Sequence, residues 1–85
     1  MKINFTKLNF TDLEGNIRSL DCSKQVANYI YAETQDIGDL LLAQEIYKGE
    51  DIEMTEENIE KIRLFLKKGF KAFVQKAFED TLNKQ

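Results

Sequence analysis

The chain has 85 residues, of which 42% are hydrophobic and 32% charged, with a net charge of −3. This size predicts a single domain over residues 1–85, and the aromatic share of 11% indicates a packed core instead of a disordered chain. A single cysteine excludes a disulfide scaffold, the lack of histidine excludes His-dependent chemistry, and no apolar run reaches the ~20 residues of a membrane span.

The first twenty residues predict a β-hairpin over residues 2–20. Apolar residues alternate with polar ones both before Thr6 and after Lys7, but the alternation changes parity between the two stretches. Such a change turns side chains to the other face of a strand, so we expect a bulge at this point. Gly15 and Asn16 tolerate positive φ and mark the turn. A lone hairpin is marginal in water, so this one should pack on helices.

Three helices are expected after the hairpin, over residues 23–33, 37–48 and 56–82. Asp36 and Thr55 are suited to begin the second and third helices, because their side-chain oxygens can accept backbone N–H bonds. The second helix is apolar almost all round, which is typical of a buried central helix. The third helix has one apolar stripe at three- to four-residue spacing and is the longest.

The last helix leaves two interpretations open. Gly69 costs ~1 kcal/mol relative to alanine inside a helix, and Phe65 and Phe78 lie off the main apolar stripe. Either the helix bends or breaks near Gly69, or other elements bury these two rings. Because the chain has no proline, a continuous helix, straight or bent, is favoured.

The expected fold is therefore α+β, an N-terminal β-hairpin packed on about three α-helices. The predicted core contains one apolar set from the hairpin and one from the helices. Its members are Ile3, Phe5, Phe10, Ile17, Val26, Ile30, Leu41, Ile46, Ile62, Leu66, Phe70 and Phe73.

The groups that could carry chemistry favour structural roles. Cys22 lies at a strand-to-helix junction, where a thiol pKa can be lowered, but no histidine can act as its base. The acids around Gly15 do not match an EF-hand loop, and the acid run over residues 50–57 does not converge on one cation. No phosphate-binding loop, nucleophile elbow or zinc signature is present. We expect no enzyme activity, no cofactor and no bound metal.

Charge is distributed unevenly along the chain. Residues 33–60 carry ten acids against one base, whereas residues 61–85 carry seven bases against two acids. Solvated helix faces that pair locally would explain this pattern. A basic helix with interleaved rings can also bind nucleic acid through phosphates and stacking. Lys61, Lys68 and Lys71 share the face opposite the apolar stripe and are the candidate residues for that alternative.

Protein binding is the function that the sequence favours. A chain of this length buries only about 60–65% of its unfolded surface, so the core is thin and self-association is a reasonable expectation. The candidate partner-binding residues are Phe65, Phe78, Tyr29 and Tyr47, and Tyr31 is a similar amphipathic group. The same rings could instead complete the core of the monomer. The predicted function is a non-enzymatic interaction or assembly module with an unidentified protein partner.

Four segments give the chain a resemblance to known proteins. They are FTDLEGNI at 10–17, QVANYIY at 25–31, DIGDLLLAQEIYKGE at 36–50 and KAFVQKAF at 71–78. This order resembles small uncharacterised proteins encoded by bacterial phages, prophages and integrated mobile elements. The resemblance spans most of the chain and implies an accessory or assembly protein made in a bacterial host. The start of the chain shows no apolar leader, and the thiol has no pairing partner, so a cytoplasmic location is expected.

Overall fold

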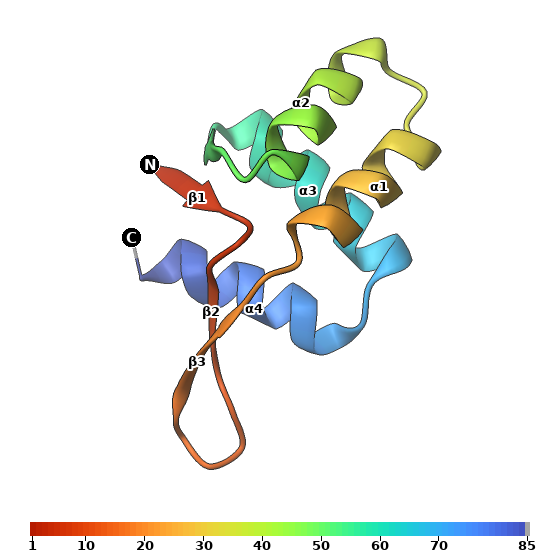
Figure 1. Cartoon of the computed structure of the whole chain (residues 1–85). Coiled ribbons are helices and arrows are strands. Elements are labelled where there is room, and N and C mark those ends of the chain that lie inside the picture. The colour runs from red at the N-terminus through yellow and green to blue at the C-terminus, as the bar shows by residue number, and fades with distance from the viewer. Residues whose placement is uncertain (85) are drawn as a thin grey trace.

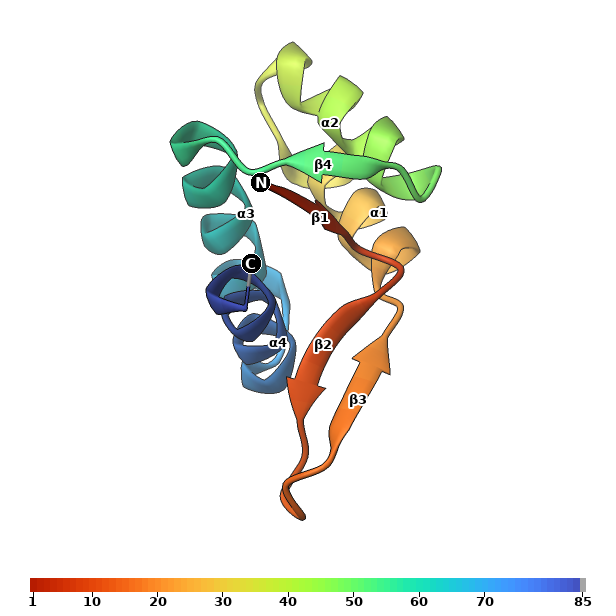
Figure 2. The same ribbon diagram turned by 90° about the vertical axis from the view of Figure 1, so that its left-hand side faces the viewer.

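The computed structural model describes residues 1–84, which form four helices and four short strands. The elements in chain order are β1 (Lys2–Asn4), β2 (Leu8–Thr11), β3 (Ile17–Leu20), α1 (Ser23–Glu33), α2 (Ile37–Tyr47), β4 (Asp51–Glu53), α3 (Glu56–Gly69) and α4 (Ala72–Asn83). The molecule is elongated, with the β2–β3 hairpin at one end and α2 at the other (Figures 1 and 2). The α+β class predicted from the sequence is confirmed.

The first strand does not belong to the hairpin. β1 pairs antiparallel with β4, with Ile3 opposite Ile52 (Figure 2). Between β1 and β2 the chain turns, and the Lys7 N–H donates to the Asn4 carbonyl at 3.1 Å. The predicted hairpin over residues 2–20 is therefore wrong in its first part, because the pairing of β2 with β3 covers only Leu8 to Leu20. The change of parity marks this turn instead of a bulge, and Phe5, within the turn, is fully buried.

Asn4 joins the turn after β1 to the segment that follows α2. Its side-chain Nδ2 donates to the Gly49 carbonyl at 2.8 Å and to Asp51 Oδ1 at 3.0 Å. Its Oδ1 accepts the Thr6 N–H at 2.9 Å. Gly49 has a φ of 77°, which favours glycine at this position. These bonds connect segments far apart in the chain, so the local sequence pattern could not reveal them.

The hairpin turn lies where the sequence placed it. Asp12 Oδ1 accepts the backbone N–H groups of Glu14 and Asn16 at 3.0 and 2.9 Å, and Gly15 takes a φ of 86°. The expectation that the hairpin packs on a helix also holds. β2 runs beside α4 (Figure 2), where Thr81 Oγ1 accepts the Asn9 N–H at 2.9 Å.

The first two helices have nearly the predicted bounds. α1 covers the predicted residues, and α2 ends at Tyr47, one residue early. The predicted caps are both present, because Asp36 Oδ1 accepts the Gly38 N–H at 2.8 Å and Thr55 Oγ1 accepts the Asn58 N–H at 3.1 Å. Side-chain caps of this kind depend on neighbours two or three residues away, which explains why the sequence identifies them.

The predicted helix over residues 56–82 is two helices. α3 ends at Gly69, and the next two residues, Phe70 and Lys71, are extended with ψ angles of 153° and 158°. The Tyr29 ring lies against Gly69, so closely that a Cβ at this position would overlap it. Phe70 also packs edge-on against the same ring at 5.6 Å. The break therefore follows from the packing of α1 against the end of α3, and the prediction of a continuous helix is wrong.

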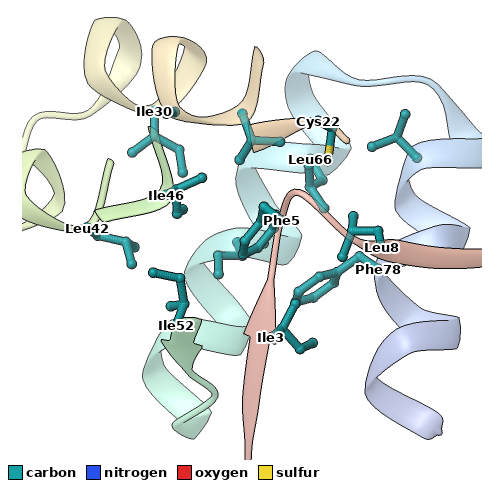
Figure 3. Close-up of a cluster of buried hydrophobic side chains, with 14 of the residues drawn as sticks. Ile3, Phe5, Leu8, Cys22, Ile30, Leu42, Ile46, Ile52, Leu66 and Phe78 are labelled. Carbon is teal, nitrogen blue, oxygen red and sulfur yellow. The ribbon is translucent and has the colours of Figure 1, made fainter. Parts of the chain in front are cut away.

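The core lies where α1, α2, α3 and α4 meet β1, β2 and β4 (Figure 3). Seven of the predicted core residues are buried, namely Ile3, Phe5, Val26, Ile30, Ile46, Ile62 and Leu66. Phe10 and Phe70 are partly buried and pack against the cluster. Ile17, Leu41 and Phe73 are exposed, and their prediction as core residues is wrong. Ile17 lies on a side of the hairpin that faces solvent, and Phe73 packs edge-on against the Phe10 ring while half of its surface stays exposed.

Candidate functional site

A groove runs between α1 and α2 on the surface of the molecule. Its lining consists of Ala27, Asn28 and Tyr31 from α1, Ala43, Gln44 and Tyr47 from α2, and Lys48 after α2. The two alanines are buried and form its floor, because their small side chains leave a hollow of about 260 Å³. The two tyrosines rise on its sides, with exposed fractions of 54% for Tyr31 and 50% for Tyr47.

The outward side of α2 continues this apolar surface. Ile37 and Leu41 are 84% and 62% exposed, and Gln44 follows them at the i, i+4, i+7 spacing that places residues on one side of a helix. Tyr47 is one further turn along. We call the groove together with Ile37 and Leu41 the α1–α2 face.

The exposure of α2 departs from the sequence prediction. A helix that is apolar all round is typical of a buried position, but Figure 1 shows α2 at the periphery of the molecule. Only one side of it enters the core, through Leu42, Ala43 and Ile46. The prediction of α2 as a central helix is therefore wrong, and its opposite apolar side faces solvent.

Two lysines lie at one end of the α1–α2 face. The Lys24 Nζ lies 5.8 Å from the centre of the Tyr47 ring, a favourable position for a cation. Lys48 lines the groove at the same end. A cation therefore lies beside the half-exposed Tyr47 ring, where the start of α1 meets the end of α2.

The candidate aromatic residues are placed differently from one another. Tyr47 lies on the α1–α2 face, whereas Tyr29 and Phe65 pack edge-on at 6.3 Å on the other side of α1 and are half-buried. Phe78 is fully buried and stacks on Phe5 at 5.9 Å (Figure 3). Of the two positions that the sequence left open for Phe78, the structure shows the buried one, so this ring completes the core and is not available to a partner.

The candidate lysines also lie in different surroundings. Lys61 Nζ is 2.9 Å from Asp39 Oδ1 and 3.1 Å from Glu57 Oε1, and these hydrogen bonds raise the pKa of Lys61. Lys68 and Lys71 are exposed at the junction of α3 and α4. Lys61 therefore joins α3 to α2 and is occupied by ion pairs, whereas the other two lysines are open to solvent.

Asp39 is the buried partner of this ion pair. Burial raises its pKa, but hydrogen bonds from Lys61 and from the Thr34 hydroxyl outweigh that effect and leave the pKa below its usual value. The carboxylate is thus charged near neutral pH and fully bonded. Its role is to hold the start of α2 to α3.

Cys22 lies in the core at the start of α1. Burial, and secondarily the charge of Asp21, raise the pKa of its thiol to about 11. Within residues 1–84, no group of three or more Cys, Asp or Glu side chains is arranged to hold a metal ion. None of the helices in this described part is long and apolar enough to cross a membrane.

Ile37 and Leu41 are the residues of the α1–α2 face that sequence reasoning missed as surface residues. The local pattern did not show which side of α2 is covered, because that depends on tertiary packing. Comparisons with protein-family models, curated proteins and solved structures found no match to this chain. The resemblance to small phage and mobile-element proteins therefore stays a prediction.

Proposed function

We propose that the chain is a non-enzymatic protein–protein interaction or assembly module that binds through the α1–α2 face. The observation that carries this proposal is that α2 is apolar almost all round but is covered by its own chain on only one side, which leaves Ile37 and Leu41 exposed. Exposed apolar patches with polar rims are typical of interaction sites. The half-exposed Tyr31 and Tyr47 belong to a residue type that is enriched in interfaces.

The apolar residues of this face supply a useful share of a binding free energy. Complete burial of an isoleucine or leucine side chain contributes about 1.5–3 kcal/mol. Scaled by the exposed fractions of Ile37 and Leu41, the two residues together contribute about 2–4 kcal/mol. The floor of small alanines between the tyrosines adds a hollow that can receive a partner side chain. Together these features support moderate affinity for a protein partner whose side chain fits the hollow.

The alternative function is nucleic-acid binding through the basic part of the chain. Lys61 is occupied by ion pairs, and Arg63 donates two hydrogen bonds of 2.7 Å to Glu79. Lys68 and Lys71 are the candidate residues that remain exposed. This arrangement favours the protein-binding proposal, because locally neutralised basic groups release fewer counterions from a phosphate backbone.

The test is affinity capture of the tagged chain from a lysate of its native host, with and without nuclease. The variant Leu41→Ser changes the α1–α2 face, and the matched control Leu64→Ser changes a residue of similar exposure (53%) on α3. We expect a stoichiometric protein that survives nuclease, is lost with Leu41→Ser and is retained with Leu64→Ser.

A third variant separates the two functions. The double change Lys68→Glu and Lys71→Glu should leave protein capture intact. Recovery that disappears with nuclease and with this double change, but not with Leu41→Ser, would refute the proposal in favour of nucleic-acid binding. The same outcome would be accompanied by a steep loss of binding as salt rises.

A further inference from the structure

Two lysines at one end of the α1–α2 face have no acidic partner from their own chain. Lys24 and Lys48 are exposed, and within residues 1–84 neither forms an ion pair with a carboxylate. Asp21, the acid nearest to Lys24 along the chain, accepts the Ser23 N–H and hydroxyl at 3.1 and 2.8 Å. The end of the face beside Tyr47 therefore keeps a positive charge that no ion pair neutralises.

The stability of α1 does not explain the position of Lys24. This lysine lies in the first turn of α1, where the helix dipole disfavours a cation, and that turn contains no acid to offset it. Lys48, in contrast, follows the last residue of α2, where the dipole favours a cation. The Lys24 Nζ lies 5.8 Å from the centre of the Tyr47 ring. A residue kept against the local preference of its helix is expected at a functional site.

The positive end and the hollow of the groove lie one helical turn apart. Ala27 and Tyr31 line the groove and follow Lys24 by three and seven residues, which places all three on one side of α1. Ala27 lies three residues from Lys24, and Ala43 lies five residues from Lys48, so the floor of the hollow is about 5–8 Å from the lysines along the helices. A ligand that fills the hollow and neutralises the lysines must carry an apolar group and an anionic group at this separation.

We propose, resting on the function proposed above, that the α1–α2 face binds an acidic amphipathic helix of a partner protein. Side chains one turn apart on a helix are about 5–6 Å from each other, which matches the separation of the hollow from the lysines. The partner helix places an apolar side chain between the two tyrosines, and a glutamate or aspartate one turn away against Lys24 and Lys48. Its apolar stripe continues over the exposed Leu41.

The backbone chemistry of the groove favours a helix over an extended segment. Both walls of the groove are helices, whose backbone N–H and C=O groups are bonded within each helix. An extended segment would bury backbone groups that these walls cannot pair, and such groups are costly. A helix satisfies its own backbone, and an amphipathic helix in an apolar groove is a recurring mode of recognition.

The two lysines select the partner at short range. The net charge of the whole chain is −3, so its overall field does not attract an acidic helix from a distance. Charged groups at an interface fix the register and reject partners that bring like charges together. A helix with lysine or arginine in place of the acid should therefore be rejected.

The first experiment selects peptides on the purified full chain from a displayed library of helices. Each library member has one stripe of leucines, and the positions that flank the stripe are randomised. We expect peptides with an acid one turn from a leucine and with dissociation constants in the micromolar range. Selection on Lys24→Glu with Lys48→Glu should return bases at the same position. The control Lys68→Glu with Lys71→Glu, at exposed lysines of the α3–α4 junction, should return acids.

The second experiment measures the affinity of one selected peptide by fluorescence anisotropy. Lys24→Glu alone should weaken binding by about tenfold, because an attraction becomes a repulsion. The same peptide with its acid changed to lysine should bind this variant better than it binds the unchanged chain. Since an acid in the first turn of α1 suits the helix dipole, the loss cannot be attributed to a weakened helix. Leu41→Ser should also weaken binding, and the control Leu64→Ser, at a similarly exposed position of α3, should not.

The outcomes distinguish this inference from the proposed function. Selected peptides without a preference for acids, or a library that yields no Leu41-dependent peptide, would overturn the inference. Leu41-dependent self-association in sedimentation equilibrium would assign the face to a second copy and would also overturn it. If a protein captured from the host lysate depends on Leu41 but is unaffected by Lys24→Glu with Lys48→Glu, the inference fails and the proposed function stands. If neither peptide binding nor capture depends on Leu41, both fail.

Discussion

Substitution of Gly69 by alanine should destabilise the protein, against the usual expectation for a helix. Gly69 is the last residue of α3 and has a helical conformation, where alanine is ordinarily favoured by ~1 kcal/mol. The Tyr29 ring occupies the place of the new Cβ. This ring is held between Phe65 and Phe70 by edge-on contacts at 6.3 and 5.6 Å, so it cannot move aside without disturbing both.

The magnitude follows from these opposing effects. Overpacking of a well-packed site costs about 1–3 kcal/mol, and the gain in helix propensity offsets about 1 kcal/mol of it. We expect a net loss of about 1 kcal/mol in the free energy of unfolding. For a domain of this size, such a loss lowers the melting temperature by about 4–8 °C.

The assay is urea unfolding of four proteins, namely the unchanged chain, Gly69→Ala, Tyr29→Ala and the double variant. In the background of Tyr29→Ala the obstructing ring is absent, so Gly69→Ala should be neutral or stabilising by up to about 1 kcal/mol. The coupling between the two positions should thus exceed about 1 kcal/mol. A stabilising Gly69→Ala in the unchanged chain, or a coupling near zero, would refute the account of the break between α3 and α4.

Three further predictions concern the interior. Asp39→Asn should lower the free energy of unfolding at pH 7 by about 1–3 kcal/mol, because it removes a charged partner of Lys61. Burial raises the pKa of Asp39, but the hydrogen bonds from Lys61 and Thr34 lower it by more, so the charged form stabilises the folded state. Since its folded pKa lies below the unfolded value of about 3.9, this contribution is present above about pH 4 and disappears as pH falls through the folded pKa. The stabilities of the unchanged chain and of Asp39→Asn should therefore converge as the pH falls below about 4. A difference in stability that stays constant with pH would contradict this role of the Asp39 carboxylate. Cys22, with a pKa of about 11, should have about one thiolate in ten thousand molecules at pH 7, so a disulfide reagent should label it only as fast as the protein unfolds. Rapid labelling of folded protein would show that the thiol is accessible. Phe78→Ala should cost about 3–5 kcal/mol in thermal or urea unfolding, and Phe73→Ala, at a half-exposed ring of the same helix, should cost much less; equal losses would refute the placement of the two rings.

The features that the sequence predicted correctly depend on short stretches of chain. The turn at Asp12–Asn16 and the caps at Asp36 and Thr55 each involve partners within four residues. Side-chain oxygens and glycine have strong preferences at such positions, whatever the rest of the fold. The starts of α2 and α3 and the hairpin turn were therefore accessible without any knowledge of tertiary contacts.

The errors concern contacts between distant segments. The pairing of β1 with β4 depends on where α1 and α2 place the chain at Asp51, and the change of parity before β2 was consistent with either a bulge or a turn. The end of α3 depends on the Tyr29 ring, which the sequence around Gly69 does not contain. The glycine was a correct signal of irregularity, but only its tertiary neighbour decides between a bend and a break.

The candidate site shows the same limit in another form. The sequence shows correctly that α2 has apolar residues almost all round. We interpreted this pattern as that of a helix buried at the centre of the molecule. Which side of α2 is covered depends on where the other elements pack, and the local pattern does not contain that information. With Ile37 and Leu41 exposed, α2 has one side in the core and the opposite side facing solvent.

The most direct test of the central claim is two-dimensional ¹H–¹⁵N NMR of the isotope-labelled chain, alone and after addition of an unlabelled lysate of its native host. The account predicts shifts or loss of signal confined to the α1–α2 face, around Tyr31, Ile37, Leu41 and Tyr47, with none around Leu64. Changes that gather on α4 and the β2–β3 hairpin, or a spectrum that the lysate does not alter, would contradict the assignment of this face as a protein-binding surface.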